Sequence, residues 1–181
     1  MLILTALYFM LPAYFANMAP VFVRNIHLFE QPLDFGKSID GRRIFGGHKT
    51  IRGIIAGVIF GTVLFAVQVW LYRFPVFQSI SLIDYGQFFA AYAVVPGALL
   101  GAGAVAGDAV KSFFKRRADI QPGKPWIPFD QIDFVIGATV FILPLHVLSW
   151  EVMVTLLIAT PVLHIATNHI GYYLKIRKVK W

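Results

Sequence analysis

Cysteine is absent from the 181 residues of this chain, and its absence removes several kinds of chemistry. Disulfide bonds, thiolate nucleophiles, iron–sulfur clusters and thiolate zinc sites all need cysteine side chains. A serine-hydrolase site is not supported either, because no serine lies in a G-x-S-x-G turn. Nor do His164 and His169 have the i, i+4 spacing of a helical zinc motif. Oxygen ligands and cationic side chains are the main reactive groups that remain.

Charged residues are also scarce, at 14% of the chain, whereas 58% of the residues are hydrophobic. A bilayer core about 30 Å thick is spanned by a helix of about 20 apolar residues. Five stretches approach this length: Leu2–Val23, Ile51–Tyr72, Gln87–Gly107, Ile132–Ser149 and Val152–Leu174. The first has no basic residue before it and is long enough to span, so we expect it to be retained. The sequence predicts an all-α membrane protein with five transmembrane helices, forming a single integral membrane domain over residues 1–181.

Positive charge is almost missing from one side of this predicted bundle. Every lysine and arginine except Arg73 lies between the first and second stretches or at the start of the second, between the third and fourth, or after the fifth. The positive-inside rule then predicts an N-terminus outside, a cytoplasmic C-terminus and two long cytoplasmic loops, 24–50 and 108–131. The net charge of +7 is therefore explained by basic loops on the cytoplasmic side of a lipid bilayer. We predict the bilayer as a partner and no nucleic acid partner. The basic tail Lys175–Lys180 is predicted to bind anionic lipid head groups.

Small residues recur within the apolar stretches at the spacing of one helical turn. These residues are Gly53, Gly57 and Gly61 in the second stretch, and Gly97, Gly101, Gly103 and Gly107 in the third. In lipid such residues let helix backbones approach closely, so they predict packing of the second helix on the third. Thr160 and other polar residues of the last stretch are predicted to join helices, although they could instead line a cavity.

The segment that follows the third stretch carries charges on one helical face. Asp108, Lys111, Ser112 and Lys115 have the spacing i, i+3, i+4 and i+7, which predicts that the helix continues into the cytoplasm. A solvated, salt-bridged helix end would show the same spacing. However, Asp108 adjoins an apolar span, where an unpaired carboxylate is costly and needs a cation.

Two further carboxylates, Asp130 and Asp133, open the fourth stretch at i and i+3. Asp130 could simply be a helix N-cap, with Asp133 favoured by the positive end of the helix. Together with Asp108, they form a set of hard oxygen ligands that suits Mg²⁺. Lysine and arginine beside a carboxylate-bound metal are what phosphoryl chemistry needs, because charge moves onto a leaving phosphate. The sequence therefore predicts a nucleotide or phosphorylated lipid as substrate.

The first loop adds glycines and cations just before the second stretch. Gly46 and Gly47 could expose backbone N–H groups to an anion, and Lys49, Thr50 and Arg52 supply donors. His48 is given no role beyond a hydrogen bond to a phosphate or base. The loop does not match a Walker A motif, since Gly47 stands where that motif requires lysine.

These motifs together resemble the archaeal CDP-archaeol synthase family. The resemblance rests on Gly46-Gly47-His48-Lys49-Thr50-Ile51-Arg52-Gly53, Gly107-Asp108-x-x-Lys111-Ser112-x-x-Lys115-Arg116 and Pro128-x-Asp130-Gln131-x-Asp133. It covers nearly the whole chain. The broader CDP-diacylglycerol synthase signature is more distant, because Ile127-Pro128-Phe129 replaces a His-Gly-Gly before the aspartates.

The resemblance implies Mg²⁺-dependent transfer of a cytidylyl group from CTP to an unsaturated polyprenyl ether-lipid phosphate, with release of pyrophosphate. It further implies site residues with four kinds of role. Asp108, Asp130 and Asp133 would hold Mg²⁺; Lys111, Lys115, Arg116 and Lys124 would neutralise phosphates; Ser112 would donate a hydrogen bond; Gly46, Gly47, His48, Lys49, Thr50 and Arg52 would close the nucleotide pocket. The alternatives are a diacyl phosphatidate cytidylyltransferase, a transport protein, or a membrane-embedded interaction subunit.

Overall fold

A computed structural model describes residues 1–173 and 175 of the chain. The described elements, in order, are α1 (Leu2–Phe22), β1 (Ser38–Ile39), β2 (Arg42–Arg43), α2 (Ile51–Leu71), α3 (Pro75–Ser79), α4 (Tyr85–Tyr92), α5 (Val95–Arg117), α6 (Phe129–Ile142) and α7 (Trp150–Tyr173). The prediction of an all-helical membrane protein is confirmed, apart from a two-stranded hairpin in the first loop. Of the predicted basic tail, only Lys175 belongs to the described residues.

Three described helices, α1, α2 and α7, are long and apolar enough to cross a membrane by themselves. The predicted third span is not one straight helix, because α4 and α5 are separated by a short break and meet at an angle of 90°. The predicted fourth span is shorter than expected, since α6 has 14 residues and ends at Ile142, just before Pro144. Proline lacks the N–H of a helical residue and disfavours helical geometry in the residue before it.

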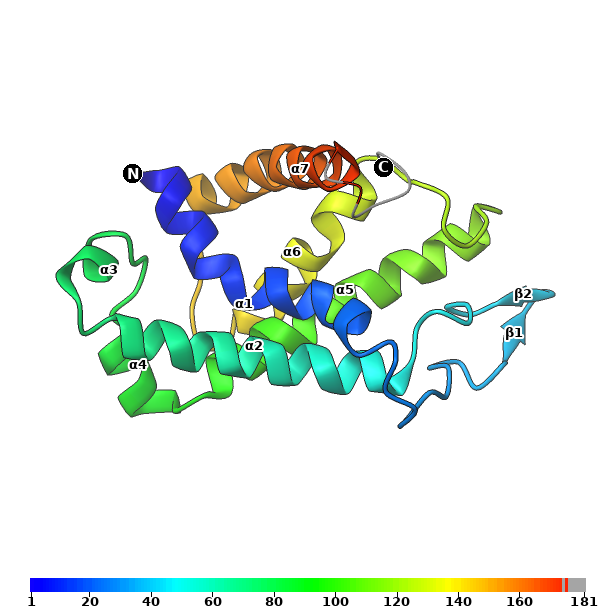
Figure 1. Ribbon diagram of the computed structural model, residues 1–181, viewed down its shortest axis with the longest axis horizontal. Helices are drawn as coiled ribbons and strands as arrows, with labels where there is room; N and C mark the ends of the chain where they lie inside the picture. The colour runs from blue at the N-terminus through cyan, green and yellow to red at the C-terminus, as the bar shows by residue number, and fades with distance from the viewer. Residues whose placement is uncertain (174, 176–181) are drawn as a thin grey trace.

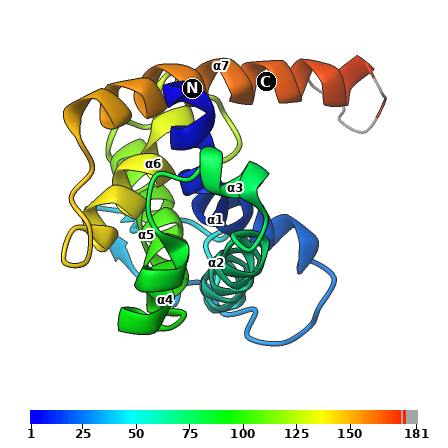
Figure 2. The same cartoon turned by 90° about the vertical axis from the view of Figure 1, so that its left-hand side faces the viewer.

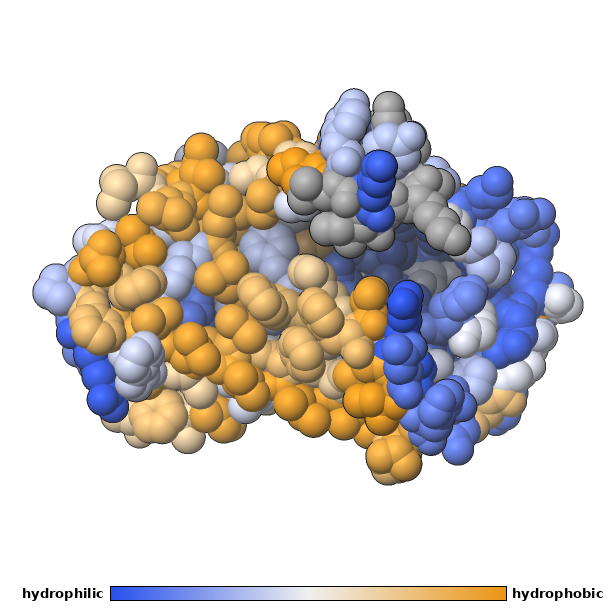
Figure 3. Space-filling model, viewed as in Figure 1, coloured by the Kyte–Doolittle hydropathy of each residue, from blue (hydrophilic) through white to orange (hydrophobic). Residues whose placement is uncertain are grey.

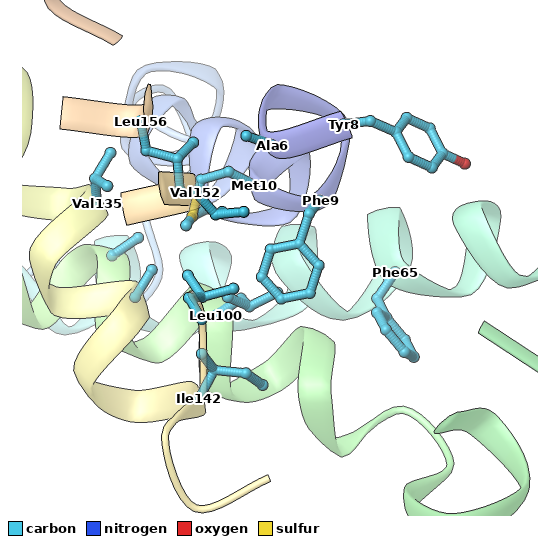
Figure 4. Packing of buried hydrophobic residues seen from close by; sticks show 14 of the residues in the cluster. Ala6, Tyr8, Phe9, Met10, Phe65, Leu100, Val135, Ile142, Val152 and Leu156 are labelled. Carbon is cyan, nitrogen blue, oxygen red and sulfur yellow. The ribbon is translucent and has the colours of Figure 1, made fainter. Parts of the chain in front are cut away.

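The helices pack in an order in which α1 lies between α7 and α2, as both ribbon views show (Figures 1 and 2). Phe9 and Met10 of α1 meet Leu100 of α5, Ile142 of α6 and Leu156 of α7 in the core (Figure 4). Each of these side chains is almost fully buried. Thr160 joins α7 to α1, with 2.6 Å between its hydroxyl and that of Tyr14, which confirms the predicted interhelical role for this residue.

Glycines form the contacts of α5 with both of its neighbours. A methyl group at Gly101 would lie 2.6 Å from the carbonyl oxygen of Gly57 in α2. On the other side of α5, a methyl group at Gly107 would meet the carbonyl oxygen of Asp133 in α6, and Gly103 faces Gly137 in the same way. The predicted packing role of the glycines is confirmed, and α5 is held at close range between α2 and α6.

The polar parts of the molecule gather at one end. In Figure 1 the loop with β1 and β2 lies beside the C-terminal end of α5, whereas α3 and α4 lie at the opposite end. Figure 3 shows hydrophilic residues over the hairpin end and hydrophobic residues over most of the remaining visible surface. The two charged segments, which are far apart in sequence, therefore share one end of the bundle.

Candidate active site

Three carboxylates converge on one lysine at the polar end of the bundle. The ammonium nitrogen of Lys111 lies 2.9 Å from Asp108 Oδ1, 2.9 Å from Asp130 Oδ1 and 2.8 Å from Asp133 Oδ2. Asp108 and Lys111 share a face of α5 as the i, i+3 spacing predicts, while both other carboxylates come from the start of α6. The close approach of Gly107 to Asp133 sets the separation of these two helices.

The first loop adds a second cation to this cluster. Lys49, which precedes α2 by two residues, donates a hydrogen bond from its ammonium group to Asp108 Oδ2. Asp108 is thus paired with two cations, namely Lys49, which lies 59 residues away in sequence, and Lys111, which lies one turn further along its own helix. The first loop and the segment that follows Gly107 therefore meet in the structure.

Lys115 ties the loop after α5 to the start of α6. Its ammonium group donates to both oxygens of Asp130, at 2.8 and 2.9 Å, and to the carbonyl oxygen of Lys124, at 2.7 Å. Burial raises the pKa of Asp130, but hydrogen bonds from Lys115, Lys111 and the Trp126 N–H outweigh it and hold the pKa below its usual range. The side chains of Lys115, Lys124 and Asp130 line a cavity of about 190 Å³.

The N-cap interpretation of Asp130 is wrong. Helix α6 begins at Phe129, its N-cap is Pro128, and the cap makes no side-chain hydrogen bond. Asp130 lies in the first turn, where its Oδ2 accepts a hydrogen bond from the backbone N–H of Trp126 at 2.6 Å. Its carboxylate therefore organises the preceding loop and pairs with lysines instead of capping the helix.

Two predicted residues of α5 lie at the edges of this cluster. The buried Ser112 donates its hydroxyl hydrogen to the carbonyl oxygen of Asp108 at 2.8 Å, within its own helix. Arg116 faces a different cavity, of about 430 Å³, whose lining also includes Gly46, Gly47 and Arg43. Among the described residues, nothing accepts a hydrogen bond from the buried Nε of Arg116. This cavity is a cationic recess beside the cluster.

The remaining predicted residues of the first loop lie in different places relative to the carboxylate cluster. His48, Lys49 and Thr50 line a recess of about 40 Å³ with Asp108. The Thr50 hydroxyl caps α2 by accepting a hydrogen bond from the Gly53 N–H at 3.2 Å. Arg52 donates to the carbonyl oxygen of Ile26 and to Glu30 Oε1, so the structure does not bring it to the carboxylate cluster.

Asp34 was not predicted as a site residue, but its side chain organises the loop that contains Gly46 and Gly47. Its side chain is fully buried, lies 2.5 Å from Arg43 Nη2, and accepts backbone hydrogen bonds from Phe45 at 3.1 Å and Gly46 at 3.0 Å. The Arg43 guanidinium, with these backbone N–H groups, holds the pKa of Asp34 well below its usual range despite burial. No sequence spacing links these residues, because an irregular loop connects them.

The hairpin is fastened to the end of α5. Arg42 Nη2 lies 2.6 Å from Asp119 Oδ2, and Arg117 donates to the carbonyl oxygen of Arg43 at 2.9 Å. These contacts join the first loop to the loop that carries Lys124 and Trp126. As a result, both walls of the cationic recess are positioned against the same helix end.

The donor set fits Mg²⁺ in its chemistry, because Asp108, Asp130 and Asp133 present carboxylate oxygens around a shared point. That point is the Lys111 ammonium group. In the described part of the chain, no group of three or more acidic or histidine side chains stands ready to hold a metal ion. The buried Asp133 Oδ2 nevertheless makes no hydrogen bond, although Lys111 Nζ lies 2.8 Å away. A divalent cation would therefore compete with Lys111 for the same carboxylates.

Comparison with known proteins shows similarity over the full length of the chain. A family model described as "CarS-like: CDP-archaeol synthase" matches residues 1–181. The CDP-archaeol synthase of Pyrococcus furiosus is 39% identical over 180 residues, which cover 99% of this chain and 98% of that protein. The protein of the same name from Methanocaldococcus jannaschii is 38% identical over 181 residues, with 99% and 98% covered.

A solved structure supports the same relationship. It is described as "Structural insight into an intramembrane enzyme for archaeal membrane lipids biosynthesis". That chain is 32% identical to the present one, with a TM-score of 0.73 and with 90% of this chain and 92% of that chain covered. Fold and sequence similarity therefore extend together over nearly all of the molecule.

Proposed function

Because the chain belongs to the CarS-like family of CDP-archaeol synthases, and is thus a cytidylyltransferase, we propose its reaction in full. In this proposal it transfers CMP from CTP to 2,3-bis-O-(geranylgeranyl)-sn-glycerol 1-phosphate. The products are unsaturated CDP-archaeol and pyrophosphate. A single observation carries the proposal, namely the convergence of Asp108, Asp130 and Asp133 on Lys111 at the polar end of an apolar bundle.

The reaction needs charge neutralisation more than proton transfer. An oxygen of the lipid phosphate, already ionised, forms a bond to the α-phosphorus of CTP, and the bond from that phosphorus to the bridging oxygen of the β-phosphate breaks. Negative charge moves onto the leaving pyrophosphate, where fixed cations stabilise it. Lys111, Lys115, Arg116 and Lys124 supply that positive charge from α5 and the loop after it. No protein general base is required.

The metal and nucleotide roles follow the same chemistry. Asp108, Asp130 and Asp133 would hold Mg²⁺, which when bound supplies further positive charge to the triphosphate. Gly46 and Gly47 border the recess that Arg116 faces, while Lys49 and His48 border Asp108, so this loop forms the other wall of a nucleotide pocket. Thr50 holds the start of α2 in place, and Ser112 would donate a hydrogen bond after rotation of its hydroxyl. Arg52 would contribute by fixing the loop through Glu30.

The site would face the cytoplasm, where CTP is made. The basic residues of both loops at this end support that orientation through the positive-inside rule. The polyprenyl chains of the lipid substrate would then stay among the helices.

A turnover assay tests the reaction directly. Purified protein is given radiolabelled CTP and either the geranylgeranyl ether-lipid phosphate or a diacyl phosphatidate, with Mg²⁺ or with a chelator. We expect label in an organic-extractable product with the ether lipid and Mg²⁺ only. Preference for the diacyl lipid would move the assignment to a phosphatidate cytidylyltransferase.

Variants then test the site. Asp133→Asn and Asp130→Asn should each lose at least about 100-fold in turnover, because they remove charge from the point where the metal is bound. Asp40→Asn, at the exposed turn of the hairpin, is the matched control and should keep full activity. Full activity in both site variants would remove the metal assignment.

A further inference from the structure

The loop that joins α1 to β1 presents apolar side chains to its surroundings at the polar end of the molecule. Ile26 is 48% exposed, Leu28 64% exposed and Phe29 58% exposed, and these three residues are called the loop tip below. The loop projects from the bundle beside the start of α2, as both ribbon views show (Figures 1 and 2). Exposed apolar clusters of this kind mark sites of contact with a membrane or another protein.

Hydrogen bonds fix this loop to the first turn of α2, where backbone N–H groups have no partner within the helix. The N–H of Arg52 donates to the carbonyl oxygen of Phe29 at 2.8 Å. The N–H of Ile51 donates to the carbonyl oxygen of Gln31 at 3.0 Å. The Arg52 guanidinium also donates to the carbonyl oxygen of Ile26. The loop tip is therefore held at the level of the first turn of α2.

The length of α2 places that first turn at the edge of the hydrocarbon. The helix has 21 residues, which extend about 32 Å at a rise of 1.5 Å per residue. A bilayer core is about 30 Å thick, so a helix of this length just crosses it and its first turn lies near the head groups.

The loop also continues the apolar outer surface of the bundle. Phe22, at the end of α1, stacks on Phe60 of α2 with ring centroids 5.8 Å apart. From there the chain runs back alongside α2 until it reaches Arg52. Phe22 is exposed, as is Ile59 on the same stretch of α2. Figure 3 shows hydrophobic residues next to hydrophilic ones at this edge of the molecule.

The charges of the loop suit a lipid surface. Glu30 is already contacted by His27 Nδ1 at 2.9 Å and by Arg52 Nη1 at 3.2 Å. Arg24 is exposed, and within the described part of the chain it forms no ion pair. A guanidinium close to a membrane attracts anionic head groups, and apolar side chains beside a basic residue are typical of segments that lie in the interface.

We propose that residues 23–30 form an interfacial membrane anchor whose partner is the anionic head-group layer at the polar end of the bundle. The loop tip inserts at the level of the head groups, and Arg24 pairs with a lipid phosphate. The anchor goes beyond the proposed function, because it requires neither nucleotide nor turnover. It also fixes the height of Lys49 relative to the bilayer, since the carbonyl oxygen of Lys49 accepts a hydrogen bond from the Leu33 N–H at 2.8 Å.

Spin labels test the anchor, because a chain without cysteine can be labelled at a single introduced cysteine. Leu28→Cys places a nitroxide on the loop tip. Ile39→Cys is the matched control, since Ile39 is also apolar and exposed but lies in the hairpin. In nanodiscs that contain phosphatidylglycerol, the ratio of nitroxide collisions with oxygen to those with a water-soluble nickel complex should be at least about threefold higher at position 28 than at position 39, because oxygen concentrates in lipid.

A second set of variants tests the chemistry of the contact. With the nitroxide on Ile26→Cys, Leu28→Asp should lower the ratio to that of the hairpin label, because a carboxylate is costly in an anionic interface. Ile39→Asp should leave it unchanged. Phosphatidylcholine in place of phosphatidylglycerol should also lower the ratio, and Arg24→Gln should remove this dependence on lipid charge, whereas Lys37→Gln should keep it.

The outcomes separate the alternatives. Equal oxygen-to-nickel ratios at Leu28→Cys and Ile39→Cys would place the loop in water and overturn the inference. A Leu28→Cys nitroxide that is immobile and shielded from both reagents would mean that protein covers the loop tip, and would overturn it as well. Neither measurement uses CTP, so an absence of cytidylyl transfer would sink the proposed function and leave the anchor standing.

Discussion

At Lys111 a single ammonium group is shared by three carboxylates from two helices, at 2.8 to 2.9 Å. Its side chain is 13% exposed and that of Asp133 is 6% exposed, so their charges are poorly screened by solvent. Removing one partner of a buried pair leaves an uncompensated charge, which costs on the order of 3 kcal/mol. Lys111 is therefore a structural cation as well as a candidate phosphate ligand.

Lys111→Met should accordingly lower Tm. Under the proposed function it should also reduce turnover by about 100-fold, because a fixed cation at the reacting phosphates would be lost. If the carboxylates also hold Mg²⁺, added Mg²⁺ should raise the Tm of Lys111→Met more than that of the unsubstituted protein, and a chelator should reverse the gain. Thermal unfolding in detergent measures both effects. Lys37→Met, at an exposed site of the first loop, should show neither. Equal Mg²⁺ responses in all three proteins would argue against metal at this cluster.

Asp34 gives a pH-dependent prediction. The Arg43 guanidinium and backbone N–H groups hold its pKa below the value in an unfolded chain, which is about 4. Its charge therefore stabilises the folded loop at every pH above that value, and the stabilisation is lost as pH falls through the lower folded value. Hydrogen exchange of residues 30–48 between pH 7 and pH 4 should show strong protection in the unsubstituted protein.

In Asp34→Asn that protection should fall, and the KM for CTP should rise, since the backbone of Phe45 and Gly46 loses its anchor. Asp40→Asn serves as the control, because Asp40 is exposed at the hairpin turn. Unchanged exchange in Asp34→Asn would show that Arg43 and the hairpin hold the loop without this carboxylate.

These two sites differ in how far the sequence could reveal them. Asp108, Lys111 and Lys115 follow helical spacing next to an apolar span, and Asp133 begins the next span, so a membrane surface brings them together. Asp34 has no periodic relation to Gly46, twelve residues away. Contacts made through irregular backbone leave no repeating pattern in the sequence.

Among the helices, α5 carries the tightest constraints, because glycines hold it against α2 on one side and α6 on the other. Gly107→Ala would push a methyl group into the carbonyl oxygen of Asp133. Overpacking of this kind costs about 1–3 kcal/mol, more than alanine gains over glycine in a helix. We expect a lower Tm and a loss of turnover, since the added methyl group would displace α6 and move Asp133 away from Lys111.

The control for this helix contact is Gly53→Ala in α2. There a methyl group would lie 3.4 Å from Pro20, which is ordinary van der Waals contact, so Tm should hold or rise. Thermal unfolding of both variants in the same detergent checks the comparison. A Tm for Gly107→Ala equal to that for Gly53→Ala would mean that α5 and α6 can separate without cost.

The positions of three apolar helices were easier to predict than the breaks in the chain between helices. Hydropathy located α1, α2 and α7 closely, and helical spacing predicted that α5 continues past Asp108. The corner between α4 and α5 was not predicted, because Ala93 lies in an apolar run and its φ of +50° has no hydropathy signature. Pro96 in the first turn of α5 indicates a helix start only once that corner is known.

Across the whole molecule, the charged segments of the site lie at one end of the bundle. The hairpin, the end of α5 and the start of α6 lie at one end, and α3 and α4 lie at the other (Figure 1). Under the proposed function, this separation would let an apolar substrate stay in lipid while its phosphate meets the cations at the polar end. The proposed function also requires that the polar end face the compartment that supplies CTP.

Because the chain has no cysteine, single introduced cysteines can report its orientation without background labelling. Ser38→Cys lies in β1 at the polar end, and Ser79→Cys lies in α3 at the opposite end; both positions are exposed. With a membrane-impermeant maleimide, the positive-inside rule predicts labelling of Ser79→Cys in intact cells and of Ser38→Cys only in inside-out vesicles. The reverse pattern would place the carboxylate cluster outside, away from CTP. In that case a cytidylyltransferase reaction at this end of the molecule would lose its nucleotide supply, and the orientation would have to be reassigned.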